Sequence, residues 1–541
     1  LAREVMFPTY RTMDEAPPRL VEGRVELHPT FGPLYQQVRE MGVIAATRPE
    51  SVGGQQLPLT VGTLANAYLM AGNLCITGLV GLTTGAGHLI EAFGDATVRD
   101  LFLSKMYDGR WTGTMALTEP QAGSSLADIT TSATPTEDGY RIRGSKIFIS
   151  GGDHDIAENI VHLVLAKIDG APPGTKGISL FAVPRRRPES GGLVDNDVQV
   201  AGVIHKIGWR GLPSLALSFG DEGDCHGWLV GEPHAGLRQM FQMMNEARIG
   251  VGINAAATAS VGYHEALGYA RDRTQGRALG ERDMTAPPES LLVHPDVRRM
   301  LLRQKTIVDA SFALCAQTAC YADVAEHGSD AERERAGLLL DLLTPITKSF
   351  PAEYGFEANH LALQVFGGYG YSSEYLPELL LRDQRLNTIH EGTTQIQSLD
   401  LLGRKVMQKG GAALGHLGRE VRSALEAAEL AGLDEAIRSP LEESLGVVEA
   451  LTMTLGQRGL AGDLEGMLGQ STAYLDLLSI VVVGWMQTRL ATAGARRGDD
   501  YGRGLVQGAR YWAAHELPRV ALLAERCRSD TSFRAMKPEW F

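Results

Sequence analysis

The sequence predicts a mainly α-helical protein with a β domain in the middle of the chain. Apolar residues recur at helical spacing before about residue 110 and after about residue 234, which favours helices in both regions. The segment between them contains short β-branched runs bounded by turn residues, which indicates strands. With 541 residues, the chain is also too long for one compact core, so we expect several domains.

The first predicted domain, residues 1–110, is helical. An apolar stripe of roughly helical period runs through residues 34–44, and residues 64–103 are rich in alanine, leucine and glycine. Glycine and proline clusters near residues 50–60 separate these two parts. The chain begins at Leu1 rather than at a methionine, so nothing is inferred about what precedes it.

The second predicted domain, residues 111–232, is a small β barrel or sandwich. Asp138-Gly139 is a turn signal, and the alternating residues 140–150 follow it before the chain reaches Gly151-Gly152. Further short strands are predicted at residues 161–166, 178–183, 198–204 and 215–219.

The third predicted domain, residues 233–409, is a helical bundle, and a fourth helical domain covers residues 415–541. Helices of the bundle are expected at residues 253–273, 293–327, 331–365 and 391–408. A glycine-rich stretch at residues 410–413 has the composition of a linker. The apolar run from Leu477 to Met486 is too short for a bilayer, which needs about 20 residues, so we expect a buried helix or strand and no membrane span.

Charge and cysteine usage argue against several classes of function. The net charge of −13 disfavours general binding to nucleic acid or to anionic membranes. The five cysteines are scattered, odd in number and without metal-ligand spacing, so no metal site is expected. The same usage favours a reduced, cytoplasmic protein.

Two segments of the β domain contain residue types suited to a planar, polar ligand. Residues 115–125 form a turn of small and hydroxyl residues, whose main-chain N–H groups can bind an anion or a polar ring edge. In the strand 147–150, Phe148 and Ser150 lie two positions apart on one face and are able to stack on and hydrogen-bond to such a ring. A plain loop, and a core phenylalanine beside a surface serine, are the structural alternatives.

Three segments of the helical region suggest polar ligands. Arg248 lies on the apolar stripe of its helix, so it must pair with buried protein or with a ligand. Residues 272–277 gather cations and a glycine at a helix end, which suits either phosphate binding or solvation. Residues 364–371 contain three glycines within four positions, which indicates close approach of a ligand or another chain, or a simple turn. The strand and helix context of a Rossmann motif is missing around them.

Glu391 stands where a helix is expected to begin, directly before Gly392 and Thr393. A carboxylate at a helix N-terminus is often only a capping or dipole partner. On this segment alone, that structural interpretation is favoured over catalysis.

Taken together and in this order, these segments resemble the acyl-CoA dehydrogenase family over residues 30–410. The most specific pieces are Thr118-Glu119-Pro120 with Ala122-Gly123-Ser124, Phe366-Gly367-Gly368 with Arg382-Asp383, and Glu391-Gly392-Thr393. The resemblance implies a helical domain, a β-barrel domain and a helical bundle, with FAD between them. The block from residue 415 is similar to the added C-terminal helical domain of the subgroup that includes 3-methylmercaptopropionyl-CoA dehydrogenases.

The resemblance also implies roles for individual residues. Glu391 is the catalytic base, and three residues are assigned to the substrate: Ser124, Arg248 and Gly392. The residues assigned to FAD are Met115, Leu117, Thr118, Ser124, Phe148, Ser150, Arg273, Gln275, Gln364, Gly368, Thr393 and Gln395. Among them, Phe148 packs on the flavin and Ser150 reaches its N5 atom. Gln364 and Gly368 touch the FAD of a neighbouring subunit, which implies at least a homodimer.

Several positions depart from the family pattern. Phe148 stands where tryptophan is usual and Ser150 where threonine is usual, and both changes keep the stacking ring and the hydroxyl. Ser125 replaces a frequent aspartate, and His390 replaces a tyrosine. An aromatic residue is missing between Gln275 and Gly276, so the FAD contacts of this segment differ from the family pattern.

The choice of base rests on two further positions. Some family members carry the catalytic glutamate directly before the arginine that corresponds to Arg248. That position is Ala247 here, which cannot accept a proton, and Glu246 is about 100° around the helix. Glu391 is therefore favoured.

The activity implied by the resemblance is α,β-dehydrogenation of an acyl-CoA to a 2-enoyl-CoA in fatty acid metabolism. Glu391 takes the α-proton, its N–H and a ribityl hydroxyl of FAD stabilise the thioester oxygen, and flavin N5 takes the β-hydride. The expected electron acceptor is an electron-transfer flavoprotein. Two alternatives stay open. One is an acyl-CoA oxidase, and the other is a non-catalytic flavoprotein that binds DNA through the arginines of its C-terminal domain. The acyl group itself is not predicted.

Overall fold

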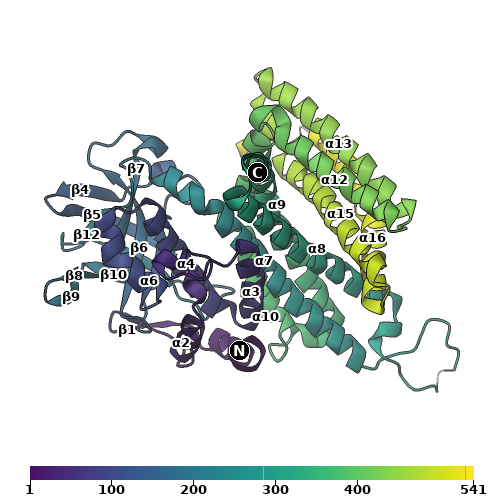
Figure 1. Cartoon of the computed structure of the whole chain (residues 1–541). Helices are drawn as coiled ribbons and strands as arrows, with labels where there is room; N and C mark the ends of the chain where they lie inside the picture. Colours follow the sequence, from purple (N-terminus) through teal and green to yellow (C-terminus); the bar gives the residue numbers. More distant parts are fainter. Residues whose placement is uncertain (284, 530–531) are drawn as a thin grey trace. The chain divides into compact units, whose positions relative to one another are not determined.

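The computed structural model describes residues 1–283, 285–529 and 532–541. The chain forms two compact units, Leu1–Ala247 and Arg248–Phe541, and the division falls inside the long helix α7 (Gly236–Asp272). Figure 1 follows the elements along the chain, and each unit is described by itself.

The first 110 residues are mainly helical, as predicted. The helices are α1 (Tyr10–Glu15), α2 (Phe31–Glu40), α3 (Leu59–Gly72), α4 (Leu74–Phe93), α5 (Ala96–Val98) and α6 (Ser104–Tyr107). Asn73 starts α4, because its side chain accepts a hydrogen bond from the Cys75 amide at 3.1 Å. A hairpin of two three-residue strands, β1 (Arg19–Val21) and β2 (Arg24–Glu26), was not predicted, since strands this short leave little sequence signal.

The middle of the chain is a β barrel with flanking strands. Its strands are β3 (Trp111–Ala116), β4 (Ser132–Thr136), β5 (Gly139–Ser150), β6 (Asn159–Ile168), β7 (Ile178–Pro184), β10 (Val198–Val203), β11 (Ser214–Phe219) and β12 (His226–Leu229), beside a separate hairpin of β8 (Arg186–Glu189) and β9 (Gly192–Asp195). The pairing runs β10-β11-β5-β12-β7-β6-β3, and β4 pairs with both β5 and β6. Because β4 joins β6 back to β5, five strands close into a ring, which confirms the barrel.

The second unit begins with the predicted bundle of long helices. After α7 come α8 (Pro295–His327), α9 (Asp330–Phe366), α10 (Pro377–Gln384) and α11 (Thr394–Asp400). Ser329 and Glu332 form a reciprocal cap at the start of α9. Short turns of tighter or wider helix, Gly367–Tyr371 and Leu401–Lys405, follow α9 and α11.

The C-terminal block is also helical and shares a core with the bundle. Its helices are α12 (Ala412–Leu430), α13 (Glu435–Leu460), α14 (Leu464–Leu468), α15 (Ser471–Arg497), α16 (Asp500–His515), α17 (Arg519–Ser529) and α18 (Ser532–Ala535). Lys409, Gly410 and Gly411 all have left-handed φ angles, so the chain breaks between helices at the predicted linker. Phe350 of α9, Val482 of α15 and Trp512 of α16 belong to one hydrophobic cluster.

Two helical segments have the length and hydropathy of a membrane span. They are Leu74–Phe93 and Leu464–Arg497, and 61% and 67% of the most apolar windows are buried inside the protein. The second segment contains the apolar run 477–486, which forms part of the buried helix α15. Because core helices pass the same test, the expected absence of a membrane span stays a prediction.

Candidate active site

Strand β5 presents Phe148 on a bulge. Lys146 and Ile149 pair with Leu217 and Leu215 of β11, so two residues of β5, one of them Phe148, oppose a single residue. Phe148 has a left-handed φ of 61°, and its side chain is 59% exposed, whereas Lys146 two positions earlier is buried. A bulge re-aims a side chain, and here it turns the aromatic ring outward. An exposed ring in a strained conformation is typical of a ligand-binding position.

A buried ion pair fixes the loop beside this bulge. Lys146 Nζ donates to Glu119 Oε1 at 2.8 Å, and both side chains are buried. The same ammonium group donates to the Leu117 carbonyl at 3.1 Å, and the following amide of β5 donates to the Thr118 carbonyl at 2.9 Å. Burial acts to raise the pKa of Glu119, but hydrogen bonds from Lys146 and Thr131 lower it to about 2. The pair therefore holds the main chain at Leu117 and Thr118 against β5.

The remaining predicted residues of the first unit lie around this anchor. Met115 is on β3, which contacts β5, and Ser150 is at the end of β5. Met115, Leu117, Thr118 and Ser150 are half-buried, and Ser124 is exposed in the loop that follows. The structure thus brings the predicted FAD residues of this unit to neighbouring strands and one loop.

In the second unit, Glu391 and Gly392 form a left-handed loop directly before α11. Their φ angles are 53° and 80°, so neither continues a helix, and the predicted helix 391–408 begins three residues later. Thr393 caps α11, because its hydroxyl accepts a hydrogen bond from the Ile396 amide at 3.3 Å. A left-handed conformation costs a residue with a side chain about 1–2 kcal/mol. Strain of this kind clusters at functional sites.

Two buried side chains hold the carbonyl groups of this loop. Lys348 of α9 donates from Nζ to the Gly392 carbonyl at 2.8 Å. Gln397 of α11 donates from Nε2 to the Glu391 carbonyl at 2.9 Å. Sequence reasoning missed both residues, as it missed Lys146, although a single charged residue, Lys348, inside the otherwise uncharged segment 342–352 is a visible signal.

The carboxyl group of Glu391 has the electrostatics of a base. Glu391 as a whole residue is exposed at the loop. The protein around its carboxyl group nevertheless desolvates this group, which raises its pKa, and the positive charges of Arg248 and Lys348 act in the opposite direction. Burial lowers the pKa of the adjacent His390 to about 4, so this ring is neutral at pH 7. A carboxylate with a raised pKa is a stronger base than an ordinary one.

Arg248 is paired within the protein. Its Nη1 donates to Asp400 Oδ2 at 2.7 Å, and the two side chains are 4% and 12% exposed. Arg404 lies 2.6 Å from the other oxygen of the same carboxylate. Arg248 was expected to pair either with a buried protein group or with a ligand, and the ion pair with Asp400 supports the first alternative. A contact of Arg248 with substrate stays a prediction.

Glu246, the rival base, is engaged elsewhere. Its carboxylate lies 3.2 Å from His88 Nδ1 and 3.8 Å from Arg48 Nη2, and both partners belong to the first unit. The hydrogen bond and the charge of His88 lower the pKa of Glu246, although burial acts to raise it. A weakened base tied to structural partners supports the choice of Glu391.

The end of α7 meets the turn after α9. The Arg273 guanidinium lies over the Tyr369 ring at 5.9 Å, and Tyr269 stacks on Phe366 with ring centroids 4.1 Å apart. These contacts bring two predicted segments, one with Arg273 and Gln275 and one with Gln364 and Gly368, to the same end of the second unit. All four of these residues are exposed.

The three glycines of this turn have different explanations. A Cβ atom at Gly370 would lie 2.2 Å from the Leu363 carbonyl oxygen, so packing within the chain requires glycine there. Gly367 has a left-handed φ of 61°, which favours glycine on its own. At Gly368 a Cβ atom would meet nothing within 4 Å. A Cβ atom at Gly367 would also meet nothing within 4 Å, so both Gly367 and Gly368 leave room for an external group, and only at Gly368 does the backbone conformation not already favour glycine.

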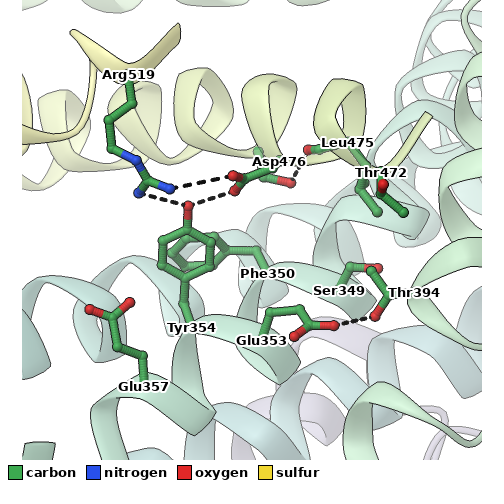
Figure 2. Close-up of a pocket in the computed structure, with 11 residues that line it drawn as sticks. Ser349, Phe350, Glu353, Tyr354, Glu357, Thr394, Thr472, Leu475, Asp476 and Arg519 are labelled. Atoms are coloured by element: carbon green, nitrogen blue, oxygen red, sulfur yellow. Dashed lines mark hydrogen bonds and ion pairs between the residues drawn. The ribbon is translucent and has the colours of Figure 1, made fainter. Parts of the chain in front are cut away.

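A hollow of about 340 Å³, lined mostly by polar side chains, lies beside Thr394, the first residue of α11 (Figure 2). Tyr354 of α9 donates to Asp476 of α15 at 2.6 Å, and Arg519 donates to the Tyr354 hydroxyl at 3.2 Å. Thr394 of α11 bonds to Glu353 on the opposite wall. None of the sequence-predicted site residues lines this hollow. It belongs to the contact between the C-terminal helices and the bundle.

The residues present fit FAD, the cofactor implied by the resemblance. Phe148 offers an exposed ring to a planar group, and the anchored Leu117 and Thr118 offer a fixed polar edge. In the second unit, the exposed Arg273 supplies a cation suited to a diphosphate. The bare main chain at Gly368 allows close approach. Each unit therefore carries its part of the predicted cofactor surface.

Family models match four consecutive parts of the chain. The chain matches the N-terminal domain of acyl-CoA dehydrogenases at residues 12–110, the middle domain at 114–221 and the C-terminal domain at 234–407. Residues 417–536 match a further domain described as acetyl-CoA dehydrogenase C-terminal like.

Curated relatives cover most of the chain. It is 37% identical to 3-methylmercaptopropionyl-CoA dehydrogenase of Ruegeria pomeroyi, over 87% of this chain and 85% of the relative. It is 32% identical to a butyryl-CoA dehydrogenase of Syntrophomonas wolfei, over 100% and 92%. It is 35% identical to the broad-specificity linear acyl-CoA dehydrogenase FadE5 of Mycobacterium tuberculosis, over 88% and 81%.

Solved structures share the fold at lower identity. An acyl-CoA dehydrogenase of Bacillus anthracis complexed with FAD has a TM-score of 0.76 at 19% identity, covering 96% of this chain and 84% of that one. Caenorhabditis elegans ACDH-11 in complex with C11-CoA has a TM-score of 0.74 at 21% identity, covering 96% and 89%. With domain matches along nearly the whole chain and relatives above 30% identity, this chain belongs to the FAD-dependent acyl-CoA dehydrogenase family.

Proposed function

We propose that this enzyme removes the α-proton of an acyl-CoA thioester with Glu391 and delivers the β-hydride to FAD, forming a 2-enoyl-CoA. The single observation that carries the proposal is the Glu391 loop. A carboxylate with a pKa raised by burial stands on a left-handed residue that two buried side chains hold in place.

The loop suits proton removal for a physical reason. An ordinary glutamate has a pKa of about 4.3 and is a weak base toward a carbon acid. Burial raises the pKa of Glu391, so its carboxylate gains more from taking a proton, while the neighbouring cations keep it ionised. The hydrogen bonds to the Glu391 and Gly392 carbonyls also fix the direction from which the carboxylate approaches the α-carbon.

The first unit is assigned to holding the cofactor. Phe148 packs against the ring, Ser150 lies beside it, and the Glu119–Lys146 pair keeps Leu117 and Thr118 in register with them. When bound, FAD supplies the hydride acceptor, a chemistry that no side chain offers. On the other unit, Gln364 and Gly368 are assigned to the cofactor of a second subunit, which makes a homodimer part of the proposal.

The substrate is proposed as a CoA thioester whose acyl group is to be found by screening. Relatives at 32–37% identity are named for 3-methylmercaptopropionyl-CoA, butyryl-CoA and linear acyl-CoAs in general. These names share the thioester and differ in the tail. Flavin reduction by acyl-CoAs of varied length and branching, including the thioether, ranks the tails. Peroxide formation in air separates an oxidase from a dehydrogenase that uses an electron-transfer flavoprotein.

Glu391→Gln tests the proposal directly. The variant keeps the size of the side chain and removes the base, so FAD is retained while bleaching of the flavin by acyl-CoA slows by at least about 100-fold. Glu246→Gln is the matched control, because that carboxylate pairs with His88 and Arg48. Wild-type bleaching in Glu391→Gln, or its loss in Glu246→Gln alone, contradicts the proposal.

A further inference from the structure

The Glu391 loop is tied to the helical bundle through Lys348. Gln397, which holds the Glu391 carbonyl, belongs to α11, the short helix that directly follows the loop. Lys348 belongs to α9, a separate 37-residue helix, and donates to the Gly392 carbonyl at 2.8 Å. A bond within one short helix moves with the loop, whereas the bond to α9 fixes the loop to the core.

Lys348 is an unusual lysine because it is fully buried without a carboxylate at bonding distance. Its relative exposure is 0%, and Thr347, Ser349 and Phe350 around it are buried as well. Among the described residues, no ion pair of Lys348 is present, and its bonded partner is a carbonyl. Burying an unpaired charge is costly, so a lysine kept in such a place is a sign of function.

Lys405 of the same unit shows the ordinary arrangement. It is 2% exposed, and its Nζ lies 3.0 Å from Asp341 Oδ1, so burial is offset by an ion pair. Burial lowers the pKa of both lysines, that of Lys348 to about 8, which leaves Lys348 charged at pH 7. The two buried lysines therefore differ mainly in the partner of the ammonium group, which is a carboxylate for Lys405 and a main-chain carbonyl for Lys348.

The charges that face Glu391 come from two helices. Arg248 projects from α7, but Asp400 of α11 pairs with it at 2.7 Å and offsets its charge. Lys348 projects from α9 and has no such partner at ion-pair distance; the carboxylates that act on it from farther away are Glu353 of its own helix and Glu391 itself. The neighbouring His390 is neutral at pH 7. Lys348 is therefore the less neutralised of the two cations that act on Glu391.

From this arrangement we infer that Lys348 is a positioning residue of the reaction: it holds the Gly392 carbonyl so that Glu391 keeps its left-handed conformation, and the same ammonium group places a positive charge beside the base. The inference rests on the proposed role of Glu391 as the base. It adds a second function for the same contact, because one ammonium group provides both a hydrogen bond and a charge.

The hydrogen bond and the charge of Lys348 have different consequences for the base. Burial favours the protonated form of Glu391, and a nearby cation favours the ionised form. Without the cation, the carboxyl group takes up a proton at higher pH and is no longer a base there. Without the hydrogen bond, the strained loop can relax and misplace the carboxylate.

Two substitutions separate these functions. Lys348→Gln keeps a donor and removes the charge, whereas Lys348→Met removes both. The measurement is the rate of flavin reduction by acyl-CoA in the FAD-loaded enzyme, recorded from pH 5 to pH 9. In both variants the acid limb of the profile moves to higher pH. Above the limb, Lys348→Met is slower than wild type by about 10- to 100-fold, because the carboxylate is misplaced, and Lys348→Gln is slowed less.

Lys405→Met is the matched control, since it also removes a buried lysine of this unit but no bond to the loop. Its acid limb stays where the wild-type limb lies. If Lys348→Met does not retain FAD, Lys348→Gln decides alone. An unshifted limb in Lys348→Gln, or the same shift in Lys405→Met, overturns the inference. Glu391→Gln keeps this result separate from the proposed function: if it bleaches normally, Glu391 is not the base, and if it does not, the Lys348 profiles test positioning alone.

Discussion

The two units each contain a fully buried lysine that donates to a main-chain carbonyl of the predicted site, and they differ in how its charge is balanced. In the β-barrel unit, Lys146 holds the Leu117 carbonyl and is neutralised by Glu119 at 2.8 Å. In the helical unit, Lys348 holds the Gly392 carbonyl without an ion pair among the described residues.

This difference matches the two proposed roles, a cofactor surface on the β barrel and a catalytic loop in the helical unit. On the β barrel the lysine has only to fix the main chain, so its carboxylate partner can be fully bonded and inert. Beside Glu391, a bonded carboxylate partner would cancel the field at the base. Leaving Lys348 without an ion pair is costly for stability but keeps a cation that acts on the carboxylate of the proposed base.

Of the effects predicted here, the largest is on stability and follows from disrupting the Glu119–Lys146 ion pair in the β-barrel unit. Glu119→Ala leaves Lys146 buried and unpaired and also removes the acceptor of the Thr130 and Thr131 bonds, so it destabilises folding by about 3–5 kcal/mol. Urea unfolding followed by near-UV circular dichroism and FAD release measures it. The double variant Glu119→Leu/Lys146→Met, which removes both charges, recovers much of the loss. Wild-type stability of the single variant would refute the anchoring role.

A smaller effect is expected at the loop of the helical unit. Gly392→Ala places a Cβ atom 2.7 Å from Gln397 Nε2 on a residue with φ of 80°, so it destabilises the protein by about 1–3 kcal/mol. It also slows flavin reduction. Gly337→Ala in α9 is the control, because a Cβ atom there meets nothing within 4 Å and the residue is helical. Equal thermal midpoints for the two variants would argue against a strained loop.

The pKa values of the two carboxyl groups are shifted in opposite directions, so the two losses on acidification should fall in separate pH ranges. Burial raises the pKa of Glu391, so flavin reduction is lost, as the pH falls, at a higher pH than an ordinary carboxyl group would give. The folded-state pKa of Glu119 is lowered to about 2, so its stabilisation is fully present above the ordinary carboxyl range, declines as the pH falls below that range and is gone below about pH 2. Stopped-flow rates and unfolding curves across pH measure the two. Activity that persists down to the pH of acid unfolding would contradict this separation.

The smallest effect is expected at Phe148. Because its ring is exposed and its φ is left-handed, Phe148→Gly relieves strain and changes the stability of the FAD-free protein by no more than about 1 kcal/mol. FAD is nevertheless lost more easily, as measured by flavin release on dilution. Phe148→Trp, the common family residue, retains FAD and controls for the change in ring. A marked loss of apo stability in Phe148→Gly would show that the ring packs within the chain.

Hydrophobic periodicity and turn residues were enough to predict the helical and β regions, because these patterns depend on local spacing. The barrel was predicted only as one of two possibilities, since closure depends on β4 pairing with both β5 and β6. The β1–β2 hairpin gave too little signal. The linker at 410–413 was visible because consecutive left-handed residues favour glycine.

The sequence by itself was enough to identify the family and the cofactor and to predict Glu391 rather than Glu246 as the base, because these follow from the order of chemical groups along the chain. Only the tertiary structure decided which charges face those groups. It paired Arg248 with Asp400, placed Phe148 on a bulge and brought Lys348, 43 positions before Glu391, to the carbonyl of the next residue. The physical reason is that burial and electrostatic contact act through space between distant segments, so the pKa of a base is set by neighbours that no local pattern reveals.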